Sequence, residues 1–189
     1  MDTTLPLAGL RVLVFVGDDY EDMELQYPRY RLEEAGADVV VAGIESGQVH
    51  KGKYGYPQKA QAAVRNLKAE DFHALIVPGG WMPDKLRRDE HVLRLTREID
   101  AAGKLVASIC HGGWIDISAG IVKGYRYTST PGIKDDLLNA GVAEWVDEPV
   151  VQDRNRITAR RPDDLPAFCR AIVAHLTPSA AAATPPASA

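Results

Sequence analysis

Apolar residues along the chain form short runs that are separated by polar segments. Four runs are rich in β-branched or small apolar residues and lie at residues 11–16, 37–44, 73–77 and 104–110. Runs without polar alternation predict strands that are buried on both faces. Two weaker runs, at residues 148–153 and 155–160, predict further strands. The Gly-rich segment 46–60 alternates too weakly to indicate more than a hairpin or a loop.

The polar segments between these runs carry helix signals. Acidic residues open the segment 18–36, where they favour a helix N-terminus, and Gly36 suits its C-terminal cap. A second helix is predicted from Asp89 to Gly103, with an apolar stripe on one face formed by Val92, Leu95 and Ile99. Shorter helical patterns cover residues 114–120, 134–141 and 163–176.

Alternation of strands and helices indicates crossover connections. It therefore predicts an α/β fold with a parallel sheet and helices on both faces. Ligands in open parallel sheets collect outside the carboxyl ends of the strands. Three segments fall at such ends and are expected to form the site: residues 17–24, 78–84 and 110–114.

Composition narrows the class of protein. The 189 residues, 46% of them hydrophobic and 25% charged, suit one soluble domain over residues 9–176. Residues 1–8 are expected to be an extension, and the Ala/Pro/Ser-rich residues 177–189 a disordered tail. A net charge of −4 argues against a nucleic-acid partner. The apolar runs are too short to span a membrane, so no membrane association is expected.

The two cysteines, Cys110 and Cys169, bear on the compartment. The first residues show no basic region followed by an apolar one, so no signal peptide is expected. A cytoplasmic location with two reduced thiols follows. The pattern "LPAFCRAIVAHL" places Cys169 in the core face of a helix.

The stretch "VASICHGGW" places Cys110 where a buried strand meets a turn, followed by His111 and two glycines. Free N–H groups of an incoming helix would stabilise a thiolate and then an oxyanion. The alternative is a buried, inert cysteine. Adjacent residues need not face each other, so His111 acts as a base only if the turn points both side chains into one cleft.

Several motifs together resemble the intracellular protease I (PfpI) branch of the DJ-1/ThiJ/PfpI superfamily, and the resemblance covers about residues 9–176. The motifs are "DYEDMELQYPRYRLEEAG", "ALIVPGGWMPDKLR", "ASICHGGWIDISAGIVKG", "PGIKDDLLNAGVAEWVDEPVV" and "RRPDDLPAFCRAI". The resemblance implies a flavodoxin-like or Rossmann-like three-layer sandwich, similar to class I glutamine amidotransferases.

The resemblance also implies site residues. The family's nucleophile on a strained elbow corresponds to Cys110, and the histidine that follows it to His111. A glutamate from a neighbouring subunit completes the family's triad, and Asp84, one methylene shorter, stands at that position. Gly79 and Gly80, together with the N–H of His111, correspond to the family's oxyanion hole.

The family places a carboxyl group from the first strand–helix loop against the thiol. Glu21 and Glu24 are both candidates by position. A protonated carboxyl there would donate a hydrogen bond to the thiolate and, with the helix N-terminus, lower the pKa of Cys110 below about 8.5. The other acids of this loop are expected to be solvated or to lie at the helix terminus: Asp18, Asp19 and Asp22.

Departures from the family pattern change the expected rim of the cleft. Gly113 and Trp114 follow "CHG", Thr130 stands where a tyrosine is common, and Trp81 replaces a frequent arginine. The rim is therefore expected to be apolar and aromatic. The alternative is that both tryptophans pack at a subunit interface.

These residues favour a stress-protective cysteine enzyme without a metal or other cofactor. Its substrate is expected to be a peptide or a small carbonyl compound, so the candidates are a PfpI-type peptidase and a glyoxalase or deglycase. The alternative is a non-enzymatic sensor or chaperone whose Cys110 is oxidised to sulfinic acid. The resemblance implies a homo-oligomer, a dimer or larger.

Overall fold

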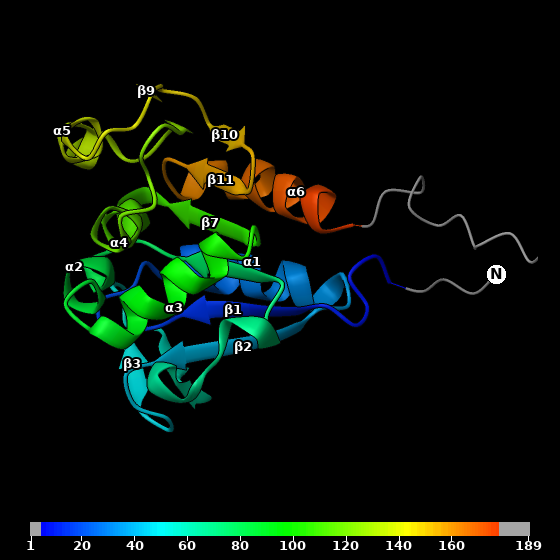
Figure 1. Cartoon of the computed structure of the whole chain (residues 1–189). Helices are drawn as coiled ribbons and strands as arrows, with labels where there is room; N and C mark the ends of the chain where they lie inside the picture. The colour runs from blue at the N-terminus through cyan, green and yellow to red at the C-terminus, as the bar shows by residue number, and fades with distance from the viewer. Residues whose placement is uncertain (1–4, 178–189) are drawn as a thin grey trace, which may run out of the picture.

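A seven-stranded sheet runs through the centre of the molecule in the computed structural model, which describes residues 5–177 (Figure 1). Neighbouring strands are parallel except for the antiparallel pair at one edge, formed by the first two strands in the order that follows. The order across the sheet is β10 (Val150–Asp153), β11 (Arg156–Ala159), β7 (Leu105–Ile109), β6 (Ala74–Val77), β1 (Arg11–Phe15), β2 (Asp38–Gly43) and β5 (Ala62–Ala63).

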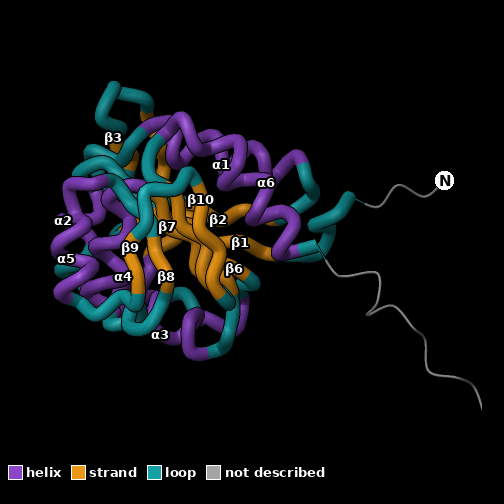
Figure 2. The backbone as a smooth tube through the Cα atoms, turned by 90° about the horizontal axis from the view of Figure 1, so that it is seen from above, coloured by secondary structure: helices purple, strands orange, loops and turns teal. Residues whose placement is uncertain are grey.

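Helices cover both faces of this sheet. On one face lie α1 (Asp22–Glu34) and α6 (Leu165–Leu176), and on the other lie α2 (Met82–Leu86), α3 (Glu90–Ala101) and α4 (Gly113–Ala119), as Figure 2 shows. The predicted three-layer α/β sandwich is confirmed. Every residue of β6 and β7 is buried, which explains why these strands appear in the sequence as unbroken apolar runs.

The helix termini follow the sequence signals. Asp89 caps α3, and its carboxylate accepts hydrogen bonds from the N–H groups of His91 at 2.9 Å and Val92 at 3.1 Å. Gly120 ends α4 with a φ of 74°, in the left-handed region that glycine adopts readily. Both caps lie at the residues where the sequence predicts a helix to begin or end, so these two boundaries are confirmed.

Smaller elements surround the carboxyl edge of the sheet. The segment 46–60 contains an antiparallel hairpin, β3 (Val49–Lys51) and β4 (Pro57–Lys59), one of the two structures expected there. Two-residue strands β8 (Arg126–Tyr127) and β9 (Glu144–Trp145) pair in parallel beside α5 (Lys134–Asn139). These strands, together with β5 and α2, are too short to show a period in the sequence.

The described ends of the chain pack against the domain. Leu7 is fully buried, and its N–H donates a 2.8 Å hydrogen bond to the Ala35 carbonyl. The predicted disordered tail falls outside the described residues apart from Thr177.

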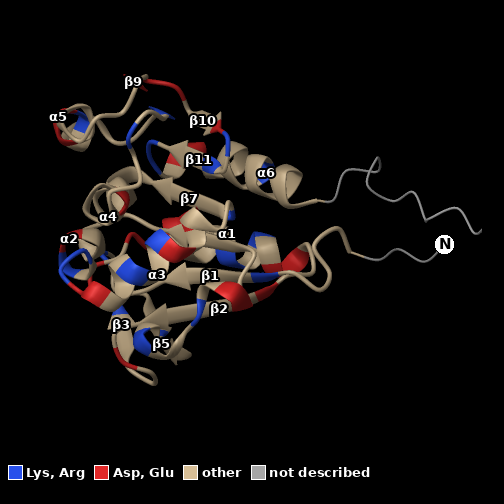
Figure 3. Ribbon diagram, viewed as in Figure 1, with Lys and Arg blue, Asp and Glu red and all other residues tan. Residues whose placement is uncertain are grey.

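Cys169 is buried in the core on α6, as predicted. Across residues 5–177, none of the helices combines the length and apolarity needed to cross a bilayer. Figure 3 shows acidic and basic residues interspersed over the visible elements.

Candidate active site

A sharp turn at the end of β7 presents the Cys110 thiol at the carboxyl edge of the sheet. Cys110 opens a short 3-10 helix, η3 (Cys110–Gly112), that leads directly into α4. Its φ of 60° lies in the left-handed region, which is costly for a residue with a Cβ and is a feature of functional turns. A Cβ on Gly112 would come within 2.4 Å of the Val77 carbonyl oxygen, so the turn requires glycine there. Cys110 is therefore held in a strained, cleft-facing turn.

The turn also brings His111 against the thiol. The distance from the His111 Nδ1 to the Cys110 Sγ is 3.3 Å. Burial, and after it the charge of Lys53, lowers the pKa of His111. A neutral imidazole at this distance can accept the thiol proton, so the arrangement meets the condition for a base.

Of the two candidate glutamates, the structure places Glu24 against the thiol. Its side chain is fully buried under the elbow, one of its oxygens accepts the Gly79 N–H at 2.8 Å, and the carboxyl interacts with Cys110. Glu21 is the N-cap of α1, and its carboxylate accepts the Glu24 N–H at 2.8 Å. The cap bond holds the Glu21 side chain at the helix terminus, whereas Glu24 in the first turn points toward the elbow.

Glu24 and Cys110 form a buried titrating pair. Burial, reinforced by the nearby charge of Glu21, raises the pKa of Glu24 from 4.5 to about 8, so the carboxyl is protonated at neutral pH. Burial also raises the pKa of Cys110, and an ionised Glu24 raises it further. Hydrogen bonds from the N–H groups of His111 and Gly80 lower the same pKa by less.

The expectation of a lowered thiol pKa is therefore wrong for this chain. The loss of water around the buried sulfur outweighs the hydrogen bonds that it accepts from the N–H groups of His111 and Gly80. Removal of the thiol proton then depends on a neighbouring base, which His111 supplies at 3.3 Å.

The predicted oxyanion hole needs one correction. The Gly79 N–H donates to Glu24 and is not available to a substrate oxygen. The N–H groups of Gly80 and His111 instead face the sulfur. Gly79 is required for space, because a Cβ there would lie 2.6 Å from a Glu24 oxygen and 2.8 Å from the Cys110 Cβ.

Asp84 does not join the site within one chain. It lies on α2, and its partly exposed carboxylate forms an ion pair with Arg88, which lies beyond the end of that helix. It is not among the residues that line the Cys110 cavity. The predicted triad is therefore not assembled by a single subunit.

The thiol opens into a cavity of about 230 Å³. Its walls come from five segments of the chain and consist of Glu21, Glu24, Lys53, Tyr54, Gly80, Trp81, Cys110, His111 and Pro162. A larger hollow of about 330 Å³ runs along α1 and contains neither cysteine nor histidine. The chemistry is therefore confined to the smaller cavity.

Sequence reasoning did not find Lys53, Tyr54 and Pro162. The first two lie in the turn of the β3–β4 hairpin, which follows the carboxyl end of β2, and that position was the available signal. Asp22 anchors this turn by accepting the N–H of Tyr54 at 2.8 Å and that of Tyr56 at 2.9 Å. Asp22 lies at the helix terminus, which is one of the two locations predicted for it. Its side chain is buried, so the other predicted location, in solvent, is wrong.

Comparison with known proteins agrees with this geometry. The family model described as DJ-1/PfpI family matches residues 10–175. A deglycase from Pyrococcus abyssi is 45% identical over 164 residues, which cover 87% of this chain and 98% of that protein. Protein/nucleic acid deglycase 2 from Escherichia coli is 37% identical over 162 residues, 85% of this chain and 94% of that one. The crystal structure of Drosophila melanogaster DJ-1beta superposes with a TM-score of 0.83 at 29% identity, covering 89% of this chain and 90% of that chain.

Proposed function

We propose that this chain, which belongs to the DJ-1/PfpI family, is a cysteine-dependent deglycase acting on α-oxoaldehydes and their early adducts with proteins. The observation that carries the proposal is the arrangement around Cys110: a strained thiol, an imidazole nitrogen at 3.3 Å and a buried carboxyl in one cavity. The similar proteins from Pyrococcus abyssi and Escherichia coli, both named deglycases, support this class of substrate.

Attack begins when the Cys110 sulfur forms a bond to the aldehyde carbon. Neutral His111 accepts the thiol proton through Nδ1, and the carbonyl π electrons move to oxygen. The N–H groups of Gly80 and His111 stabilise that oxyanion. Glu24, protonated at neutral pH, supplies a proton to it.

The hemithioacetal that forms is one isomerisation from a thioester. The hydrogen on the former aldehyde carbon leaves as a proton, the adjacent carbon gains a proton, and the hydroxyl proton passes to the former ketone oxygen, so no external oxidant is needed. One water then hydrolyses the thioester, which releases a 2-hydroxy acid and restores the thiol. With methylglyoxal the balance is one methylglyoxal plus one water to one lactate and one proton.

The test is a measurement of methylglyoxal loss and lactate formation with purified protein. A second measurement follows the decay of a preformed adduct of methylglyoxal with N-acetylarginine. An adduct that decays faster than it dissociates without protein is attacked directly, whereas decay limited by dissociation indicates consumption of free methylglyoxal. Cys110→Ala should abolish both activities.

Cys169→Ala is the matched control, because it removes the second thiol from the core rather than from the cavity. It should retain activity if it folds. Lactate formation that survives in Cys110→Ala would contradict the proposal. Cys110-dependent cleavage of peptides without any consumption of methylglyoxal would replace it with a peptidase.

The same proposal includes a homo-oligomer in which Asp84 of one subunit approaches His111 of another. Two features support it. The Asp84 carboxylate is partly exposed on α2. The acidic residues that line the cavity of His111 are Glu21 and Glu24, and each of them accepts a backbone N–H group. A carboxylate that reaches the imidazole would stabilise the protonated ring formed during attack.

A further inference from the structure

Aromatic side chains form the mouth of the Cys110 cavity. Trp81 is 57% exposed, and its ring centroid lies 5.6 Å from that of His111. Tyr54, which is 74% exposed, contributes to the wall from the hairpin turn. Large exposed aromatic surface at a cavity that holds a nucleophile indicates contact with a ligand.

The indole of the neighbouring Trp114 already contacts two other side chains of the chain. Its indole N–H donates to Asp136 at 2.8 Å, and the guanidinium carbon of Arg87 lies 5.6 Å from its ring centroid. It packs against His111 at 5.0 Å between ring centroids and so supports the imidazole. Trp81 is therefore the indole that is left to contact a substrate.

Hydrogen bonds fix the backbone segments that carry the two exposed rings. The Trp81 N–H donates to the Asp19 carbonyl at 2.9 Å. The hairpin turn of Tyr54 is fixed by Asp22 and by the Tyr20 hydroxyl, which donates to the Tyr56 carbonyl at 2.6 Å. Because these segments are fixed, only the side chains of Trp81 and Tyr54 would lose conformational freedom on binding.

The electrostatics of the cavity suit a group with little charge. Glu24 is protonated at neutral pH, and the lowered pKa of His111 keeps its imidazole neutral. Lys53 places its ammonium 5.1 Å from the Tyr54 ring centroid, over the aromatic face. Lys53 and Glu21 also line the cavity, and beside them the mouth offers the flat apolar faces of two aromatic rings.

We propose that Trp81 and Tyr54 are specificity-determining residues that select carbonyl substrates bearing a planar aromatic group. This inference rests on the proposed attack by Cys110 on α-oxoaldehydes and names the class of substituent that the site prefers. The aromatic group would stack on Trp81 while the aldehyde carbon reaches the sulfur.

The first experiment compares kcat/KM for phenylglyoxal and methylglyoxal. The phenyl-to-methyl ratio for the wild type should exceed the ratio of the rates at which N-acetylcysteine adds to the two aldehydes by about tenfold. Loss of one stacking contact in Trp81→Ala should lower the ratio about fivefold. Trp81→Phe, which keeps a ring, should retain more than half of the preference.

Tyr30→Ala is the matched control, because Tyr30 is an exposed aromatic residue on α1 that does not line the cavity. It should leave the ratio unchanged. Circular dichroism and light scattering on every variant exclude misfolding and changes in assembly as the cause of a shift.

A second readout does not require turnover. Iodoacetamide and 2-iodo-N-phenylacetamide both alkylate Cys110: the sulfur–carbon bond forms, the carbon–iodine bond breaks, iodide leaves with the bonding pair and His111 takes the thiol proton. If the inference is right, the ratio of phenyl to unsubstituted rate constants exceeds that of N-acetylcysteine and falls in Trp81→Ala.

The outcomes separate the two proposals. A phenyl preference in alkylation without consumption of either aldehyde would support the aromatic site and overturn the proposed enzyme. Turnover of both aldehydes with a ratio unaffected by Trp81→Ala would overturn the inference and leave the enzyme intact. A wild-type ratio equal to that of N-acetylcysteine, as expected if a second subunit covers Trp81, would also overturn the inference.

Discussion

Replacing Glu24 by glutamine removes a buried ionisable group while keeping the shape of the side chain. The amide oxygen can still accept the hydrogen bond that Gly79 donates at 2.8 Å. The variant therefore isolates the free energy that this carboxyl contributes to folding through its protonation. The structure fixes both the sign and the size of the effect.

The sign follows from the raised pKa. Folded protein holds the Glu24 proton up to about pH 8, whereas the unfolded chain releases it near pH 4.5. The stabilising effect of protonation is fully present below pH 4.5 and is lost as the pH rises to about 8. At about 1.4 kcal/mol per pH unit, the free energy of unfolding falls by about 3 kcal/mol by pH 7 and about 4 kcal/mol by pH 8, where the folded group is half ionised.

Glutamine is neutral at every pH, so Glu24→Gln lacks this loss. The variant should match the wild type at pH 4.5 and exceed its free energy of unfolding by about 4 kcal/mol at pH 8. Urea unfolding, followed by circular dichroism at intervals between these pH values, measures the difference directly.

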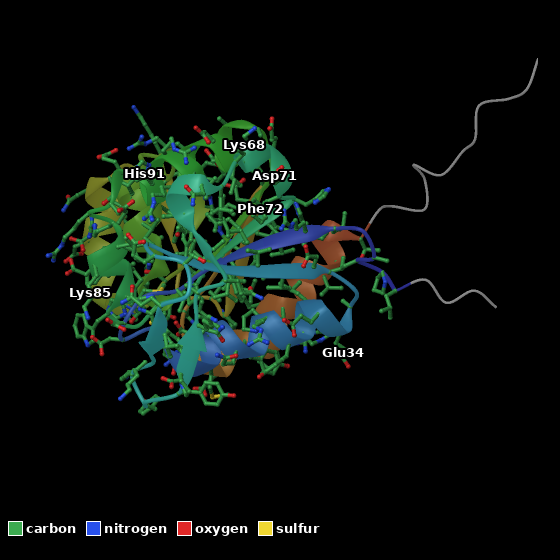
Figure 4. All side chains as sticks on the ribbon, turned by 90° about the horizontal axis from the view of Figure 1, so that it is seen from below. Glu34, Lys68, Asp71, Phe72, Lys85 and His91 are labelled. Carbon is green, nitrogen blue, oxygen red and sulfur yellow. The ribbon has the colours of Figure 1, made fainter. Side chains whose placement is uncertain are left out.

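Glu34→Gln is the control. Glu34 is the last residue of α1, and its side chain points outward from the end of that helix (Figure 4). Its ion pair with Arg31 is solvent-exposed, and its loss should change the free energy by less than about 0.5 kcal/mol. A difference between Glu24→Gln and wild type that stays below about 1 kcal/mol up to pH 8 would refute the argument from burial.

Three further predictions concern other parts of the chain. Asp116→Ala should destabilise the fold by about 3–5 kcal/mol in urea unfolding, because it removes one of the two carboxylates beside the buried guanidinium of Arg156 and the acceptor of the Ser108 and Tyr127 hydroxyls; a loss below about 1 kcal/mol would contradict this. Graded peroxide should oxidise Cys110 before Cys169, since Cys110 opens into a cavity whereas Cys169 is buried in the core; peptide mass mapping that finds Cys169 modified first would refute it. Asp84→Asn should lower kcat at least tenfold without changing the mass from light scattering, and a wild-type monomer at micromolar concentration would exclude a shared triad.

Local patterns were sufficient to predict the α/β class and to place Cys110 at the end of a strand, whereas its role as a nucleophile was implied by the resemblance to the PfpI branch. The runs that became β1, β6 and β7 lack polar alternation because both faces of these strands are covered. Asp89 and Gly120 marked helix ends because each satisfies backbone groups within its own turn. Cys110 was found because a strand ends directly before it and two glycines follow within three residues.

The partners of the thiol depend on contacts between distant segments. Glu21 and Glu24 are equivalent by position in the sequence, and the helix phase together with the cap bond separates them. Gly79 looked like an oxyanion donor until its N–H was found on a carboxyl that comes from 55 residues earlier in the chain. The prediction of a lowered Cys110 pKa was wrong for the same reason, since burial is a property of the packed molecule.

Hydrophobic periodicity and local hydrogen bonds predicted the longer strands and helices, the caps at Asp89 and Gly120, and the edge of the sheet where Cys110 lies. These signals involve residues a few positions apart, so they can be found in the sequence. The cavity that Lys53, Tyr54 and Pro162 share with Cys110 depends instead on contacts between distant segments. Strand order and crossover connections bring these segments together, and the resulting burial changes pKa values and exposure in ways that no local pattern encodes.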